Sequence, residues 1–105
     1  MNIETIAMNI IASAGDARAF AFRALEEAKN GNYEEAEKLM EDSKRAALEA
    51  HKVQTELLTS EVSGEKVDIN ILLIHSQDHL MNSLLAQELI KELIILYKNK
   101  EDRGE

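Results

Sequence analysis

The sequence contains no cysteine, so the chain can form no disulfide bond and offers no thiolate as a nucleophile or zinc ligand. It also contains no proline, and only four of its 105 residues are glycine. Domains of this size that are rich in β-strands need many turns, which glycine and proline usually supply. The scarcity of both residues therefore favours an all-helical protein, and the length fits one domain, residues 1–105.

Positive charge is scarce as well, since Lys and Arg total 12 against 20 Asp and Glu, a formal net charge of -8. Such an acidic surface repels phosphate backbones, which argues against a nucleic-acid partner. The longest apolar runs, Ile71–Ile74 and Leu93–Tyr97, are far shorter than the roughly 20 residues that span a bilayer. The N-terminus lacks the basic and apolar stretches of a secretory signal. We therefore expect a soluble, cytoplasmic protein.

Two short breaks divide the chain into three periodic segments. Residues 30–32 (Asn-Gly-Asn) combine a helix stop with an N-cap at Asn32, and Glu35 follows three residues later, as in a capping box. Residues 63–65 (Ser-Gly-Glu) end the second segment, and Asp68 is expected to cap the third. The pattern predicts an antiparallel three-helix hairpin with a charged, mobile tail from about residue 99. The expected helices cover residues 3–29, 33–61 and 69–100.

The first two predicted helices carry heptad seams of small residues, which allow helices to approach closely and indicate a packed core. The seam of the first helix contains Ile3, Ala7, Ile10, Ala14, Ala17, Ala21, Ala24 and Ala28. The seam of the second contains Ala36, Leu39, Ser43, Ala46, Ala50, Val53 and Leu57.

The third predicted helix has more apolar surface than one hairpin can bury. Between residues 69 and 90 its only charged residues are Asp78 and Glu88, whereas an outer helix of a monomeric bundle should show a charged stripe. Two apolar rows lie about 110° apart on a helical wheel. We expect one row to face the core and the other to face a second copy of the chain, so the protein should be a homo-oligomer. The first row is Ile71, Ile74, Asp78, Met81 and Leu85, and the second is Leu73, Leu80 and Leu84.

Asp78 interrupts the first of these rows, where an isolated buried carboxylate is costly. Two interpretations remain open from the residues alone. If the row is a symmetric seam, copies of Asp78 meet around an axis and favour a shared proton or a hard cation such as Mg²⁺. Alternatively, Asp78 pairs with a basic residue of another helix, such as Arg18 or Lys44.

Residues 75–79 (His-Ser-Gln-Asp-His) invite a further interpretation. His75 borders the apolar seam and lies three residues before Asp78, so the two side chains can share one site. The run also resembles the inverted zinc-peptidase motif H-x-x-E-H, in which His75 and His79 would bind zinc with Glu88 or Glu92. Against a zinc hydrolase, Asp78 is one methylene shorter than the expected base, and a small helical chain offers no substrate cleft.

Four stretches resemble one family closely, the enzyme IIA component of the lactose/cellobiose class of the bacterial phosphoenolpyruvate-dependent sugar phosphotransferase system. They are Ala14-Gly15-Asp16-Ala17-Arg18, Glu49-Ala50-His51 with Gln54-Thr55, Ser63-Gly64-Glu65, and His75-x-Gln77-Asp78-His79-Leu80-Met81. The similarity extends from about residue 3 to about residue 98. Ser76, where relatives often have Gly or Ala, is a departure within the last motif.

The resemblance implies a homotrimer of three-helix hairpins, a nine-helix bundle. It implies that His75 accepts a phosphoryl group from phospho-HPr and passes it to a cysteine of enzyme IIB, while the membrane component IIC imports the sugar. It further implies one Mg²⁺ per trimer, held by Asp78 of the three chains. Gln77 and His79 are candidates to support His75, whereas His51 and Asp16 are assigned no catalytic role. A helical adaptor without phosphotransfer stays open as an alternative, and the sugar cannot be identified.

Overall fold

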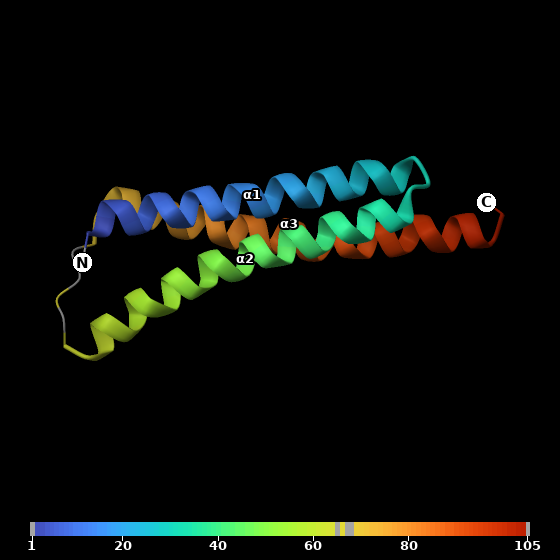
Figure 1. Ribbon diagram of the computed structural model, residues 1–105. Coiled ribbons are helices and arrows are strands. Elements are labelled where there is room, and N and C mark those ends of the chain that lie inside the picture. Colours follow the sequence, from blue (N-terminus) through green and yellow to red (C-terminus); the bar gives the residue numbers. More distant parts are fainter. Residues whose placement is uncertain (1, 65, 67–68, 105) are drawn as a thin grey trace.

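The chain folds into three long α-helices, α1 (Ile3–Lys29), α2 (Tyr33–Val62) and α3 (Ile71–Asp102), as Figure 1 shows. The computed structural model describes residues 2–64, 66 and 69–104, and no strand occurs among them. The predicted all-helical hairpin is confirmed. α1 and α3 run in the same direction, and α2, which connects them in the chain, runs antiparallel to both. α1 has the predicted bounds, α2 ends one residue later, and α3 begins and ends two residues later than expected.

The turn between α1 and α2 lies where it was predicted but is built differently. Gly31 adopts a φ of 81°, a left-handed conformation that glycine takes without strain. Asn32 occupies the N-cap position, yet its side chain makes no capping hydrogen bond. Instead, Asn32 Nδ2 donates to Glu27 Oε2 at 2.8 Å. The expected capping box with Glu35 is therefore wrong, because the asparagine amide bonds the end of α1 rather than the start of α2.

The start of α3 is capped by Asn70, whose Oδ1 accepts a hydrogen bond from the backbone N–H of Leu73 at 2.8 Å. The cap expected at Asp68 lies outside the described residues. At the other end, α3 continues to Asp102, so the first residues of the charged tail are helical.

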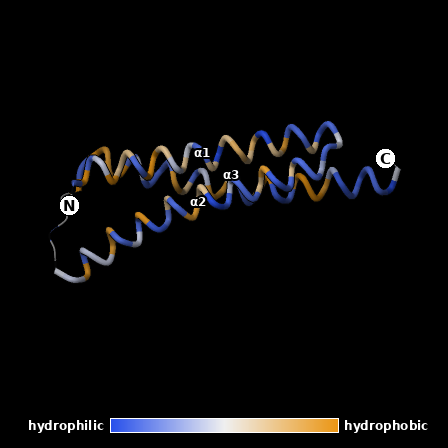
Figure 2. The backbone as a smooth tube through the Cα atoms, viewed as in Figure 1, coloured by the Kyte–Doolittle hydropathy of each residue, from blue (hydrophilic) through white to orange (hydrophobic). Residues whose placement is uncertain are grey.

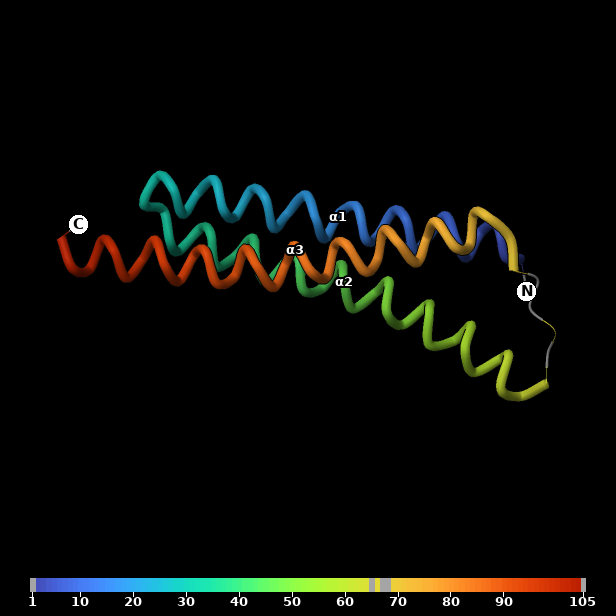
Figure 3. The backbone as a smooth tube through the Cα atoms, turned by 180° about the vertical axis from the view of Figure 1, so that it is seen from behind, coloured from blue at the N-terminus to red at the C-terminus, as the bar shows by residue number. Residues whose placement is uncertain are grey.

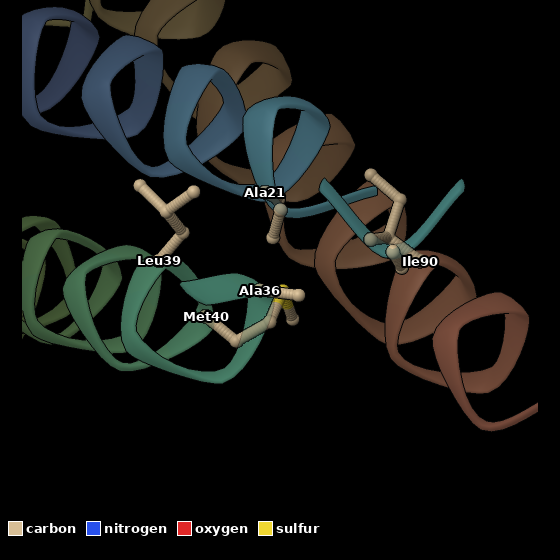
Figure 4. Packing of buried hydrophobic residues seen from close by; sticks show 7 residues of the cluster. Ala21, Ala36, Leu39, Met40 and Ile90 are labelled. Carbon is tan, nitrogen blue, oxygen red and sulfur yellow. The ribbon is translucent and has the colours of Figure 1, made fainter. Parts of the chain in front are cut away.

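Alanine side chains form most of the seam of α1, and the structure buries seven of the eight positions predicted there. On α2 the prediction is right at most positions, but Ala47 is buried in place of Ala46, and Val53 is only half-buried. α2 packs mainly on α1 and much less on α3, so its buried stripe is centred on one neighbour and turns away from Ala46. Figure 4 shows one cluster of this core, which includes Ala21, Ala36, Leu39, Met40 and Ile90 from all three helices.

Buried serine hydroxyls fix the helices in register. Ser43 Oγ on α2 donates to the carbonyl of Ala17 on α1 at 2.6 Å and accepts a hydrogen bond from Gln87 Nε2 on α3 at 2.8 Å. Ser83 Oγ on α3 donates to the carbonyl of Ala14 on α1 at 2.8 Å. Each hydroxyl bonds one particular carbonyl, whereas alanine side chains pack equally well after a shift along the axis. The hydrogen bonds therefore fix the register of the helices along their axes more strictly than alanine packing does.

The helices do not stay together along their whole length. In Figures 1 and 3, which view the molecule from opposite sides, the C-terminal half of α2 diverges from the pair formed by α1 and α3. Figure 2 shows that apolar residues recur along this diverging half as well. Within the described residues, no helix has both the length and the apolar character needed to cross a membrane.

Candidate functional site

A small cavity beside the N-terminal half of α3 contains most of the candidate residues. Its volume is about 300 Å³, and it is lined by Arg18, His75, Asp78, His79, Asn82 and Ser83. Local sequence explains why these side chains face it. Leu80 is buried, Ser76 Oγ donates to the carbonyl of Leu73 at 2.6 Å, and Ser83 is bonded to α1. These contacts turn one face of α3 inward and leave His75 and Asp78 exposed at the surface.

His75 and His79 form a contacting pair within this cavity. Their Nε2 atoms lie 3.0 Å apart, and the ring centroids are 4.4 Å apart with the planes at 87°. In this contact the ring nitrogen of one histidine donates a hydrogen bond and that of the other accepts it. His75 is exposed while His79 is half-buried, which places His75 on the side that a partner protein can reach.

Asp78 is exposed and makes no ion pair with any described residue. Arg18 lines the same cavity, yet no nitrogen of Arg18 lies within 4.0 Å of the carboxylate, and Lys44 contacts Glu41 at 3.7 Å instead. The ion pair of Asp78 with Arg18 or Lys44, one of the two interpretations left open by the sequence, is therefore absent among the residues that the structure describes. The carboxylate keeps its full capacity to accept bonds from outside the chain.

The two apolar rows of α3 separate as the sequence predicts. Leu73 and Leu80 are buried and Leu84 is half-buried against the core. The row that contains Asp78 is exposed, with its apolar members between 55% and 85% accessible to solvent. Those members are Ile71, Ile74, Met81 and Leu85. An uncovered row of this kind on a folded chain marks an interaction surface.

The zinc-hydrolase alternative is not supported by the arrangement of possible ligands. In the described part of the chain, no three His, Asp or Glu side chains gather closely enough to hold a metal ion. Glu88 lies nine residues after His79 on the same helix, about 14 Å along its axis, and Glu92 lies farther still. Neither glutamate can join the two histidines around one ion.

Three other residues named from the sequence lie away from this cavity. Gln77 lines a separate cavity of about 260 Å³ between α2 and α3, together with Gln54. Gln54 Oε1 is buried there and accepts no hydrogen bond from the described residues. His51 is exposed on α2 and Asp16 is exposed on α1, and neither lines the cavity of His75.

Sequence reasoning gave no functional role to Arg18, Asn82 or Ser83, although all three line the cavity. The sequence named Arg18 only as a possible ion-pair partner of Asp78 and as part of a stretch that carries the family resemblance, residues 14–18. Its place in the lining of this cavity depends on how α1 packs on α3.

Comparison with known proteins gives concordant matches over nearly the whole chain. Residues 5–98 match the sequence model of the family described as PTS system, Lactose/Cellobiose specific IIA subunit. The N,N'-diacetylchitobiose-specific EIIA component of the Escherichia coli phosphotransferase system is 43% identical over 96 residues, which cover 91% of this chain and 83% of that protein.

Solved structures agree in fold as well as in sequence. The PTS cellobiose-specific enzyme IIA from Bacillus anthracis superposes with a TM-score of 0.95 at 48% identity, over 99% of this chain and 95% of that one. A chain in the solution structures of the IIA(Chitobiose)–HPr complex from Escherichia coli matches with a TM-score of 0.80 at 38% identity, over 96% and 98% of the two chains. These likenesses extend over all three helices.

Proposed function

The chain belongs to the lactose/cellobiose-specific IIA family of the phosphotransferase system, and from this premise we propose that His75 carries a phosphoryl group between two partner proteins. The donor is phospho-HPr, and the acceptor is a cysteine of enzyme IIB. The complex of a related IIA chain with HPr supports the choice of donor. The relay takes place in the cytoplasm and serves the uptake of a lactose/cellobiose-type sugar through the membrane component IIC.

The observation that supports His75 most directly is its place in the cavity. Its ring is exposed and contacts His79, and the lone pair of an imidazole nitrogen is a competent nucleophile for phosphorus. That lone pair attacks phosphorus and forms a new P–N bond. The P–N bond to the HPr histidine breaks, and the HPr imidazole keeps the electron pair.

In the second transfer the bonds change in the same manner. The thiolate of the IIB cysteine attacks phosphorus, the P–N bond to His75 breaks, and the imidazole is restored with its electron pair. Phosphoryl transfer requires mainly positioning and charge stabilisation, so a shallow site shared by two proteins suffices. This accounts for a cavity of only about 300 Å³ at the surface of α3.

Asp78 has a different part in the proposal. Its exposed carboxylate makes no ion pair in the described chain and lies in the exposed apolar row of α3. In a homotrimer, a nine-helix bundle, three copies of Asp78 would hold one Mg²⁺, an ion that prefers oxygen ligands. A single chain offers too few ligands, so the donor set fits this ion only when three chains combine. The ion would neutralise the carboxylates, and no transfer step depends on it.

Of the two residues expected to support His75, only His79 contacts it. His79 orients His75 through the contact between their Nε2 atoms, so it acts as a positioning residue. Gln77 does not line the cavity of His75 in its own chain but lines a second cavity together with Gln54, whose carbonyl accepts no hydrogen bond from the described residues. Gln77 therefore serves the site of another copy in the trimer or has a purely structural role.

A phosphorylation assay with phosphoenolpyruvate, enzyme I and HPr tests the proposal. We expect one acid-labile phosphate per chain, and His75→Gln should remove it. His51→Gln is the matched control because His51 is exposed on α2, away from the cavity, and it should label normally. His79→Gln should retain part of the label. Full labelling of His75→Gln would contradict the assignment.

The second candidate function is a helical adaptor that oligomerises without carrying phosphate. The exposed apolar row on α3 favours it, because that row provides an interface whether or not His75 reacts. Absence of labelling in the wild-type chain, with HPr and enzyme I from the same source, would select this candidate.

A further inference from the structure

A second row of side chains runs along α1 beside the buried alanine seam. Its members follow one another at spacings of three and four residues, so they lie on one face of the helix. The largest of them are poorly covered, since Met8 is 53% exposed and Phe22 is 49% exposed. This flank row consists of Met8, Ile11, Gly15, Arg18, Phe22 and Leu25. A single chain therefore covers this face of α1 only in part.

Gly15 lies in the middle of the flank row, and its own chain does not account for it. The residue is helical and has no positive φ. A Cβ atom placed on it would meet no described atom of another helix within 4 Å. Glycine destabilises a helix interior relative to alanine, so a glycine here is unfavourable for the single chain. The missing side chain instead leaves room for a second molecule close to the backbone of α1.

Arg18 and Glu88 carry opposite charges and make no ion pair within the part of the chain that the structure describes, whereas Lys44 and Arg45 each contact an acidic neighbour. Both side chains are exposed. The guanidinium of Arg18 is held on the flank row by Phe22, with Cζ 5.6 Å from the ring centroid. Each charge is thus available to a group from outside the chain.

The two charges lie at nearly the same height along the rod. The hydrogen bond from Ser83 Oγ to the carbonyl of Ala14 joins residues that are 69 positions apart. Since α1 and α3 run in the same direction, each residue of α1 is level with the residue about 69 positions later on α3. By this register Arg18 is level with Gln87, the residue next to Glu88.

The two sides of α3 adjoin different helices. In the proposed trimer the exposed apolar row of α3, which contains Asp78, faces the three-fold axis. On a helical wheel Glu88 and Asn82 lie about 60° to either side of this row. Asn82 shares a cavity with Arg18, so its side of the row adjoins α1. Gln77, on the side of Glu88, shares a cavity with residues of α2.

A three-fold rotation keeps every residue at its own height and sets one side of each chain against the opposite side of the next. The flank row of α1 is thereby turned toward the side of α3 that carries Glu88 in the neighbouring copy. We propose that α1 packs through its flank row on α3 of that copy, and that Arg18 forms an ion pair with Glu88 of the partner subunit. This inference rests on the proposed trimer and adds which surfaces meet in it. Gly15 allows the close approach, and Phe22 is covered by it.

Charge reversal tests this contact. Arg18→Glu brings two carboxylates together at each interface, and Glu88→Arg brings two guanidinium groups together. Each single variant should raise the concentration at which half of the trimer dissociates by about 10- to 100-fold, because like charges that meet in an interface repel. The double variant Arg18→Glu/Glu88→Arg restores the pair with its polarity reversed, so it should recover most of the loss. Sedimentation equilibrium over a range of protein concentrations provides the measurement.

The chain supplies a matched control in Arg23. Its Cζ lies 5.8 Å from the ring centroid of Phe20, so it is another exposed arginine of α1 beside an aromatic ring, but it lies outside the flank row. Arg23→Glu changes the net charge as Arg18→Glu does and should leave the trimer intact. Arg23→Glu/Glu88→Arg should dissociate as readily as Glu88→Arg alone.

The other results decide against the inference. Unchanged dissociation in both single reversals, or a double variant no better than either single one, would overturn it. Equal weakening by Arg23→Glu would replace it with a general effect of charge. If circular dichroism shows that the reversals do not fold, Gly15→Ala decides: a weakened trimer supports the close contact, and an equal or stronger trimer overturns it. A wild-type chain that sediments as a monomer would refute the proposed trimer itself, before any variant is compared.

Discussion

Ser43 shows how much one small polar side chain contributes to this fold. The heptad pattern predicts it only as a seam position, and the structure adds that its hydroxyl joins all three helices through Ala17 and Gln87. The residues that sequence predicts well are those whose environment repeats along a helix, as the alanines of α1 do. Arg18 could not be placed in this way, since its surroundings depend on which helix packs beside it.

Ser43→Ala should lower the stability of the folded chain by about 1–3 kcal/mol, because it leaves the buried carbonyl of Ala17 and the amide of Gln87 without their partner. Urea denaturation at one fixed protein concentration measures the change. Ser60→Ala, which alters a half-buried serine of α2 outside these bonds, is the control and should change the midpoint little. Equal midpoints for both variants would show that the hydroxyl bonds contribute nothing.

Among the helices, the sequence predicts best which face of α3 is buried and which is exposed, and it predicts the buried face of α2 least well. Only Asp78 and Glu88 are charged between residues 69 and 90 of the sequence, so an uncovered apolar row on α3 follows from composition alone, and the structure confirms it. The buried stripe of α2 was placed one residue away at Ala46, because heptad spacing cannot tell which of two neighbours a helix will approach more closely.

Asp78→Leu tests the apolar row of α3 directly. The variant should keep the proposed trimer and melt at a higher temperature, because leucine removes repulsion among carboxylates and completes the row. Its melting temperature should also no longer depend on added Mg²⁺. Differential scanning calorimetry with and without the ion provides the measurement.

Glu26→Leu is the control for this change, since it removes an exposed carboxylate of α1, on another helix than the row. It should leave the Mg²⁺ dependence intact. Dissociation of the Asp78→Leu protein into single chains would show that the carboxylate holds the assembly together by ion pairing, contrary to the axial arrangement.

The molecule as a whole is a thin rod, with principal extents of 58 × 19 × 18 Å and a radius of gyration of 16.7 Å. A compact domain of this length would have a radius of gyration of roughly 13 Å. A rod has a large surface for its volume, and much of the buried seam consists of alanine, which contributes little apolar area. The single chain therefore leaves large apolar side chains exposed, which the proposed trimer would bury.

The proposed trimer should persist at micromolar concentration. Sedimentation equilibrium should give three times the monomer mass of 11.8 kDa, since the exposed rows of α3 bury one another. Met81→Lys, which places a charge in the middle of the exposed row, should shift the equilibrium toward smaller species. A wild-type mass of 11.8 kDa at these concentrations would contradict the prediction.

The divergence of α2 from α3 has a consequence for how the backbone opens. The last turns of α2, up to Val62, diverge from the pair formed by α1 and α3, so their amide hydrogens are protected chiefly by the local stability of one helix end. Deuterium uptake in this stretch should be fast in dilute solution and slow once a second copy covers it. The hydrogen-exchange rate of each amide at the end of α2 would then show whether the chains have assembled.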